Sequence, residues 1–167
     1  MRAVLLVFFN LCLLRRGPEI VPTQPWFVAS IVLLYTLVGV YLSTRAVGQA
    51  GMLATLTYLM VSMATTASMT WFVLYLRQLE ARFPATITAL FGCDLVLSAL
   101  LAVLVQFTGA TDSLATQSLA AVIGVWAIIV AGFVLHRAMN VSWTVGMLLA
   151  LGMGLFSMAL GNVASPR

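Results

Sequence analysis

One acidic residue lies in the middle of a long apolar stretch of this chain. Asp94 stands between Cys93 and Leu95, with aromatic and aliphatic residues on either side. If the stretch is a membrane-spanning helix that begins at Pro84, the carboxyl group lies about 12–15 Å along that helix. A carboxylate at such a depth is costly and usually marks a functional site. We therefore expect Asp94 either to bind a proton or cation between helices, or to fix helix packing through hydrogen bonds.

Hydroxyl side chains are frequent in the apolar run from Met52 to Leu76. Hydroxyl groups can bond to a neighbouring helix, so Ser62, Thr65 and Thr66 are candidate partners of Asp94. These four residues form the intramembrane polar site that the sequence predicts. No second acid, lysine or arginine lies at a similar depth in an apolar run. Because a transport relay generally needs more than one such group, the sequence favours the structural role for Asp94.

Other reactive residue types form no convincing pattern. Cys12 and Cys93 stand in apolar runs without a CxxC spacing, which predicts two buried thiols. Met60 and Met63 carry thioethers, which bind Cu(I), but methionine is also an ordinary gap-filler in an apolar chain. The sequence has no nucleophile–base pair, phosphate loop or metal-binding motif. We therefore expect a protein that is not an enzyme, with no catalytic residue, no metal and no cofactor.

Small residues recur at four-residue spacing in two apolar runs. Gly146, Ala150 and Gly154 form one row, and Gly124 follows Ala120 in another. Rows of this kind let a second helix approach closely. We expect these residues to pack helices together, either within the chain or against another subunit.

The basic residues mark the ends of the apolar runs. All eight are arginines, and they are scattered instead of forming a patch that would bind nucleic acid. A positive charge at a helix end complements the helix dipole and needs no ligand. The same charges are candidates for binding lipid headgroups or marking the membrane interface. The residues in question are Arg15, Arg16, Arg82, His136 and Arg137.

Composition indicates the elements that must position these residues. Of the 167 residues, 63% are hydrophobic and only 7% are charged, whereas about a quarter of the residues in soluble domains are charged. Helices need roughly 17–25 apolar residues to cross the hydrocarbon core of a bilayer. The runs that approach or exceed this length are Trp26–Leu42, Met52–Leu76, Pro84–Phe107, Leu114–Leu135 and Val141–Leu160. The sequence predicts an all-α integral membrane protein with five transmembrane helices, because lipid offers no partner for unpaired backbone groups.

The N-terminal segment differs from these runs. Met1–Leu14 is too short to span a bilayer comfortably. It leads into two arginines and Gly17 without a small-residue cleavage site, so we expect no cleaved signal peptide. Residues 1–17 are predicted to form a short helix, interfacial or partly buried, and residues 18–25 a proline-rich linker. The five-helix transmembrane bundle then covers residues 26–160, and residues 161–167 form a short tail.

The distribution of arginines predicts the orientation in the membrane. With five spans, six arginines lie on the side of the N-terminus and two, Arg45 and Arg167, on the other side. The positive-inside rule assigns the richer side to the cytoplasm. We therefore expect a cytoplasmic N-terminus and, in a bacterial inner membrane, a periplasmic C-terminus.

Three short segments resemble a known group of proteins. Leu14–Glu19 with Pro22, Arg82–Gly92 and Leu135–Met139 resemble small proteobacterial inner-membrane proteins, similar in layout to the five-span Yip1-like family. The resemblance implies a helical membrane protein that binds other proteins or shapes membranes without catalysis. The chain departs from that family because no substantial cytosolic region precedes its first span. The resemblance therefore implies no trafficking role and transfers no functional residue.

Two functions are consistent with these features. The short loops, the rows of small residues and an apolar N-terminal segment that needs cover favour a noncatalytic accessory or scaffold subunit. Such a subunit would pack, within the lipid bilayer, against a larger membrane protein complex or against copies of itself. The alternative is a small transporter or channel with Asp94 on its path. The surroundings of Asp94 distinguish the two, because a water-accessible cavity that reaches it favours transport and a dry, hydrogen-bonded setting favours the scaffold.

Overall fold

The described part of the chain is almost entirely helical. The computed structural model describes residues 2–15, 17–47, 52–108 and 114–164, and within these ranges it contains helices and turns but no strand. Five helices in these ranges are long and apolar enough to cross a membrane. They are α2 (Pro25–Val47), α3 (Met52–Leu76), α4 (Phe83–Thr108), α5 (Leu114–Met139) and α6 (Trp143–Ala164). The prediction of an all-α membrane protein with five spans is confirmed.

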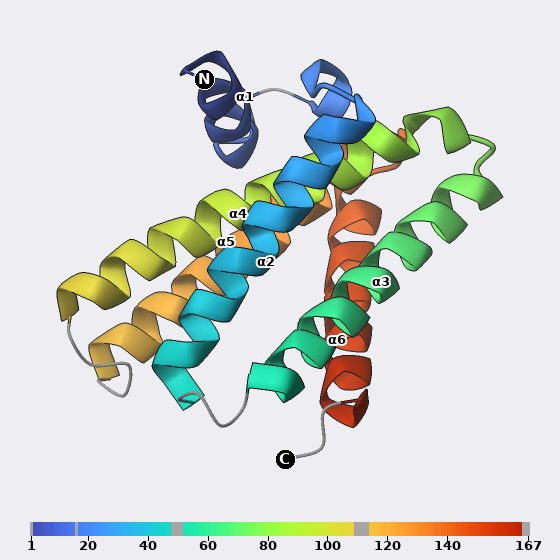
Figure 1. Cartoon of the computed structure of the whole chain (residues 1–167). Coiled ribbons are helices and arrows are strands. Elements are labelled where there is room, and N and C mark those ends of the chain that lie inside the picture. The colour runs from blue at the N-terminus through green and yellow to red at the C-terminus, as the bar shows by residue number, and fades with distance from the viewer. Residues whose placement is uncertain (1, 16, 48–51, 109–113, 165–167) are drawn as a thin grey trace.

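The long helices run alternately between two ends of the molecule (Figure 1). The short helix α1 (Arg2–Cys12) and the 3-10 turns η1 (Pro18–Ile20) and η3 (Glu80–Arg82) lie towards one end, and the C-terminus lies at the opposite end. The most extensive packing joins α5 to α6, α3 to α6 and α2 to α4. Helix α6 therefore connects α3 to the rest of the bundle.

The helices differ in length from the apolar runs that predict them. Helix α2 continues to Val47, α5 to Met139 and α6 to Ala164, because polar residues at the end of a run still continue the backbone hydrogen bonds. At the other extreme, α1 ends at Cys12, although a helix over residues 1–17 was predicted. The turn that follows Cys12 explains that difference.

Left-handed residues end three of the helices. Leu14, Gln78 and Asn140 have φ values of 59°, 57° and 55°. In each case the amide of the next residue donates a hydrogen bond to the carbonyl five positions earlier. This arrangement is a Schellman motif, which satisfies carbonyls at a helix C-terminus and reverses the chain. The motif stops α1 before Gly17 and begins the short connections that follow α3 and α5.

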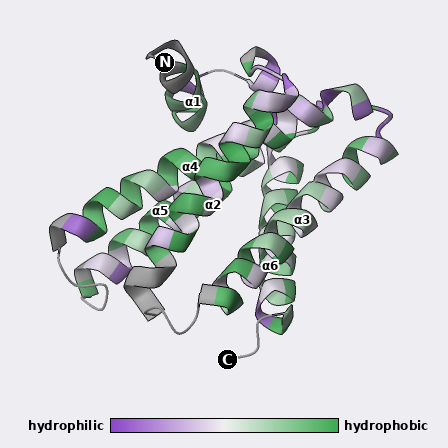
Figure 2. Ribbon diagram, in the orientation of Figure 1, coloured by the Kyte–Doolittle hydropathy of each residue, from purple (hydrophilic) through white to green (hydrophobic). Residues whose placement is uncertain are grey.

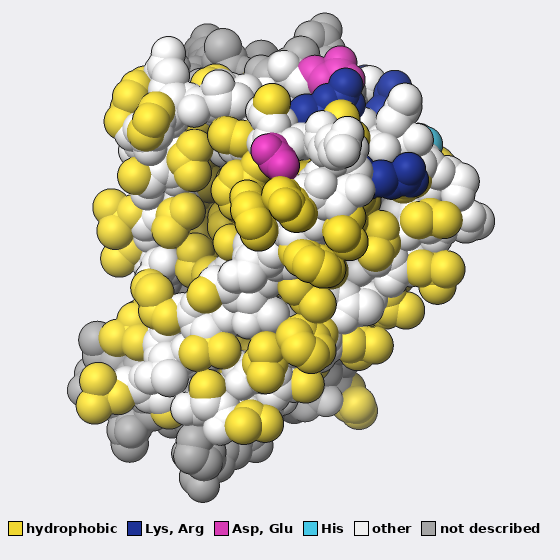
Figure 3. All heavy atoms as spheres, turned by 90° about the vertical axis from the view of Figure 1, so that its right-hand side faces the viewer, with side chains coloured by type: hydrophobic (Ala, Val, Ile, Leu, Met, Phe, Trp, Pro, Cys, Tyr) yellow, Lys and Arg dark blue, Asp and Glu magenta, His cyan; other side chains and the backbone are white. Residues whose placement is uncertain are grey.

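The outer surface of the bundle is apolar along its length. Large side chains such as Leu33, Leu53, Leu148 and Leu155 are more than 60% exposed, and the helices are coloured mainly hydrophobic in Figure 2. In Figure 3 the charged side chains on the visible face gather at the end that holds η1 and η3. Apolar residues exposed in this way are consistent with contact with a lipid bilayer.

Aromatic side chains border the charged end. Trp26 and Trp143 are exposed at the first turns of α2 and α6. Trp71 and Tyr75 lie in the last turns of α3 and stack with their ring centroids 5.2 Å apart. Tryptophan and tyrosine are enriched where a membrane protein passes from hydrocarbon to headgroups. These side chains therefore indicate where the bilayer surface meets the bundle.

Helix α1 is buried against the bundle. Phe8, Leu11 and Cys12 are at most 5% exposed. Phe8 stacks at 6.3 Å from Phe27 of α2, and it lies so close to Gly92 of α4 that a Cβ there would overlap its ring. Gly92 lies about 14 Å along α4 at 1.5 Å per residue. The short N-terminal helix is therefore partly buried, one of its two predicted placements, and it reaches well below the charged end.

The buried end of α1 has partners for its backbone groups. Trp126 of α5 donates its indole N–H to the carbonyl of Cys12 at 3.2 Å, and the amides after the helix bond back to its last turns. The chain then returns to the charged end, where Gly17 lies beside Arg137. Irregular backbone at membrane depth is tolerated only where protein buries it and satisfies its polar groups. The indole and the Schellman turn meet that requirement.

Candidate functional site

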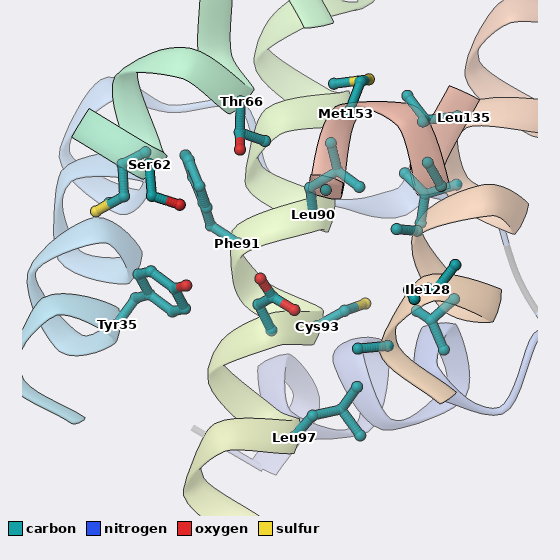
Figure 4. A pocket seen from close by; sticks show the side chains of 18 residues that line it. Tyr35, Ser62, Thr66, Leu90, Phe91, Cys93, Leu97, Ile128, Leu135 and Met153 are labelled. Atoms are coloured by element: carbon teal, nitrogen blue, oxygen red, sulfur yellow. The ribbon is translucent and has the colours of Figure 1, made fainter. Parts of the chain in front are cut away.

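The five long helices enclose a cavity of about 190 Å³. Its polar side chains are Tyr35 of α2, Ser62 and Thr66 of α3, and Asp94 of α4. Figure 4 shows Tyr35, Ser62 and Thr66 approaching it from the side opposite α5. The apolar wall includes Phe91 and Leu97 of α4, Ala131 and Val134 of α5, and Ala150 and Met153 of α6. The cavity is therefore built by all five spans and is apolar except on one side.

Asp94 is the ionisable carboxyl group of this cavity. It lies about 16 Å along α4, counting at 1.5 Å per residue from Phe83. Among the described residues it has no hydrogen bond or ion pair, and the cavity lining includes no arginine or histidine. Every buried side-chain oxygen or nitrogen of the described residues has a partner, so the carboxyl oxygens are open to the cavity. Asp94 thus faces a cavity and has no hydrogen-bond partner among the described residues.

Ser157 of α6 organises the hydroxyl groups of α3. Its Oγ is 3.0 Å from the carbonyl oxygen of Ser62, 2.7 Å from the Ser62 Oγ and 3.4 Å from the Thr66 Oγ1. A serine hydroxyl has one hydrogen to donate, and a carbonyl can only accept, so Ser157 donates to the Ser62 carbonyl. In the 2.7 Å bond Ser62 must then be the donor, and Thr66 likewise donates to Ser157.

The directions of these hydrogen bonds determine which atoms of the hydroxyl groups remain available to a ligand in the cavity. Ser62 and Thr66 both donate their hydroxyl hydrogens to Ser157, so only the lone pairs of their oxygens remain available for further hydrogen bonds. Neither hydroxyl is bonded to Asp94, although the sequence suggested that pairing. Ser62, Thr66 and Asp94 therefore present hydrogen-bond acceptors to the cavity: two hydroxyl oxygens and a carboxyl group.

Tyr35 adds an aromatic ring and a third hydroxyl. Its ring centroid lies 5.8 Å from that of Phe91, with the ring planes tilted by 32°. In Figure 4 its hydroxyl points from α2 toward α4. No hydrogen bond to that hydroxyl is formed among the described residues. The site thus combines one carboxyl group, three hydroxyls and two aromatic rings.

The predicted polar site is assembled in part. Asp94, Ser62 and Thr66 line one cavity, but Thr65 does not. The Thr65 Oγ1 donates to the carbonyl of Val61 in the preceding turn at 2.7 Å. Ser157, which is 4% exposed and directs the hydroxyl hydrogens, was not predicted. Its position on the same face of α6 as Gly146 was the available signal.

The predicted helix-packing residues have two different environments. Gly146 and Ala150 are buried, and a Cβ on Gly146 would lie 2.5 Å from the carbonyl oxygen of Gly132 in α5. Gly154 and Gly124 are exposed, and a Cβ on either would have no atom within 4 Å. The close approach of α5 and α6 therefore occurs at Gly146, within the chain. Gly154 borders the cavity.

Two of the predicted interface residues complete the end of α5. The Arg82 Nη1 donates to the carbonyl of Ala138 at 3.2 Å, and the Nδ1–H of His136 donates to the carbonyl of Val141. The last carbonyls of a helix have no partner within the helix. Both side chains therefore act on the turn between α5 and α6.

The remaining predicted interface residues are exposed where the structure describes their side chains. Arg137 is exposed and its guanidinium lies 5.8 Å from the ring centroid of Phe133, at cation–π distance. Arg15 is exposed in the turn that follows α1. Arg16 lies outside the described residues.

The two cysteines lie close together but form no larger cluster. The Cys12 Sγ is 3.9 Å from the carbonyl oxygen of Cys93, and both thiols are free and buried. Within the described ranges no group of three or more His, Cys, Asp or Glu side chains could hold a metal ion. The thiols therefore belong to the contact between α1 and α4.

Comparisons with known proteins assign the chain to no family. The resemblance to the Yip1-like proteins stays a prediction. No protein-family model, curated protein or solved structure matches the chain.

Proposed function

We propose that the protein is a small membrane transport protein that binds a cation at Asp94. The observation that carries the proposal is the carboxyl group of Asp94, open to a cavity between five spanning helices and without a partner among the described residues. The sequence favoured the scaffold, and the cavity at Asp94 reverses that preference.

The energetics of a buried carboxylate support this proposal. A carboxylate removed from water is costly unless a cation or hydrogen-bond donors compensate for the lost solvation. The neighbouring hydroxyls of Ser62 and Thr66 direct their hydrogens to Ser157, and no arginine lines the cavity. The Tyr35 hydroxyl is one donor that the cavity offers, and a bound cation would supply the charge compensation that no described side chain of the lining provides. Binding and release of that cation is the elementary step of transport.

We further propose that the charged end of the bundle faces the cytoplasm of a bacterial cell. The exposed arginines Arg77, Arg82 and Arg137 lie at the end of the molecule that holds η1 and η3. The positive-inside rule supports this orientation in an inner membrane. A reporter enzyme fused after Arg167 should then be active only in the periplasm, and cytoplasmic activity would reverse the orientation.

The second candidate function is an accessory subunit of a larger membrane complex. The observation that favours it is the first half of α5, where Gly124 is exposed with open space in front of it. A partner helix could approach closely at such a position. One argument for this function is weaker than the sequence suggested, since the bundle itself covers the face of α1 that carries Phe8, Leu11 and Cys12, although Phe9 is still 56% exposed. Stoichiometric co-purification of a large complex from native membranes would support this second function.

Cation flux into proteoliposomes tests the transport proposal. The purified chain is reconstituted with a voltage-sensitive dye and an internal pH dye, and gradients of protons, sodium, potassium and small ammonium ions are applied in turn. We expect flux of at least one cation, lost in Asp94→Asn. Glu80→Gln is the matched control, because it makes the same chemical change at the exposed charged end. Absence of flux in the unaltered protein, or equal flux in Asp94→Asn, would reject transport through this site.

A further inference from the structure

We infer that the ligand of the cavity is a small primary ammonium ion with an apolar, ring-sized body. This inference rests on the proposed function, since it names the class of cation that Asp94 would bind. Three independent properties of the cavity lead to it: the direction of its hydrogen bonds, the composition of its walls and its volume.

The direction of the hydrogen bonds selects a donor. Ser157 takes the hydrogens of Ser62 and Thr66, so these hydroxyls can only accept from a ligand. Asp94 adds a carboxyl group, which accepts two or more further bonds when ionised. A primary ammonium has three N–H groups and no acceptor. It matches the acceptors of Ser62, Thr66 and Asp94, whereas a carboxylate or phosphate ligand would find the Tyr35 hydroxyl as its hydroxyl donor and would be repelled by the Asp94 carboxylate.

The walls select an apolar body. Apart from the four polar side chains, the cavity is bordered by aliphatic, aromatic and small residues from α4, α5 and α6. The rings of Tyr35 and Phe91 lie together beside the polar side of the cavity. Aromatic faces attract organic cations and stack on flat apolar groups. A bare metal cation would leave the apolar wall uncovered and would need more oxygen ligands than one carboxyl group and three hydroxyls provide.

The volume limits the size of the ligand. The cavity measures about 190 Å³, and an engineered apolar cavity of about 150 Å³ holds one benzene molecule. The cavity therefore has room for one six-membered ring and a short arm that ends in an ammonium group. Benzylammonium has this size and these groups, and it is the probe that we choose.

Calorimetric titration of the chain in lipid nanodiscs tests the inference, with titrations into empty nanodiscs subtracted. The probes are benzylammonium, its neutral analogue benzyl alcohol, the anion benzoate, and sodium. We expect saturable binding of benzylammonium that is at least about tenfold tighter than that of benzyl alcohol, because hydrogen bonds between charged groups are stronger than neutral ones. Benzoate should not bind. Equal affinity for the amine and the alcohol, or no saturable binding, would overturn the inference.

Two variants locate the ligand in the cavity. Asp94→Asn should remove the preference for the amine over the alcohol, and Glu80→Gln should preserve it. Ala131→Leu puts three more carbons into the cavity wall and should weaken benzylammonium more than methylammonium, which needs less room. An unchanged preference in Asp94→Asn, or equal weakening of both amines in a folded Ala131→Leu, would contradict the proposed site.

The two proposals can fail separately. Asp94-dependent flux of protons or sodium without benzylammonium binding would reject the ligand and retain transport. Benzylammonium binding at Asp94 without flux of any cation would retain the ligand and reject transport.

Discussion

The polar residues at the charged end and those at the centre of the bundle are arranged in opposite ways. At the end, Arg82 and His136 donate to backbone carbonyls of the α5–α6 turn, and Arg137 lies over the ring of Phe133. At the centre, Asp94 has no partner among the described residues, and the hydroxyl hydrogens of Ser62 and Thr66 are directed to Ser157.

This difference separates polar groups that stabilise the fold from a polar group that is available to a ligand. A satisfied hydrogen bond to a charged group contributes about 1.5–3 kcal/mol to stability. A buried carboxyl group without a partner contributes nothing of that kind and costs solvation free energy. Substitutions at the end should therefore reduce stability, and substitution of Asp94 should reduce binding. The three predictions that follow test this separation by thermal unfolding in detergent.

The largest effect is expected where α5 and α6 touch. In Gly146→Val the Cβ would lie 2.5 Å from the carbonyl oxygen of Gly132 and 2.9 Å from the Cβ of His136, so the helices must separate. Overpacking of this kind costs about 1–3 kcal/mol of stability and sometimes more. We expect a loss at the upper end of this range, because the nearest atom belongs to the backbone and cannot move aside as a side chain can. Gly154→Val is the matched control in the same helix, because its Cβ would meet no atom within 4 Å. Equal loss of stability in the two variants would contradict the assigned packing.

A smaller loss is expected from Arg82→Met. The change removes the bond from Nη1 to the carbonyl of Ala138 and keeps much of the apolar stem of the side chain. Because the arginine is exposed, we expect a loss of about 1 kcal/mol, below the range for buried charged hydrogen bonds. Arg77→Met removes the same charge from an exposed position at the end of α3 and should change stability by less than about 0.5 kcal/mol. If Arg77→Met is as destabilising as Arg82→Met, net charge is responsible and the capping contact is not.

The smallest effect is expected from Asp94→Asn. Without a hydrogen bond to lose, the free energy of unfolding should stay within about 1 kcal/mol of the original value, or rise because the cost of burying a charge is removed. A loss of more than about 2 kcal/mol would restore the structural role for Asp94 that the sequence favoured. In that case the contrast between the end and the centre would not hold.

The spans could be predicted from sequence, because a long apolar run without barrel alternation can satisfy its backbone hydrogen bonds in lipid only as a helix. Part of the site could also be predicted. Asp94, Ser62 and Thr66 were recognised as polar residues within those runs, and they line one cavity. Their hydrogen-bond partner could not be found in the same way. Which hydroxyl meets which depends on how α3 and α6 rotate about their axes, and no local pattern reports that rotation.

Helix geometry explains why Gly154 lies off the face of α6 that packs within the chain. At 100° per residue, a step of eight residues from Gly146 turns Gly154 by about 80° away from the packed face. A step of eleven residues returns Ser157 to within about 20° of it. The buried face of α6 accordingly consists of Gly146, Ala150, Met153, Ser157 and Gly161. A row that takes every fourth residue from Gly146 therefore turns away from the buried face of α6 and does not include Ser157.

The indole cap on α1 has a consequence for the order of assembly during synthesis. Trp126, whose N–H satisfies the carbonyl of Cys12, follows it by 114 positions. At roughly 5–20 residues per second, the ribosome makes the tryptophan about 6–23 s after the cysteine. Until then the end of α1 lacks the partner for its last carbonyl. Helix α1 is therefore made well before the contact that fixes its end within the bundle.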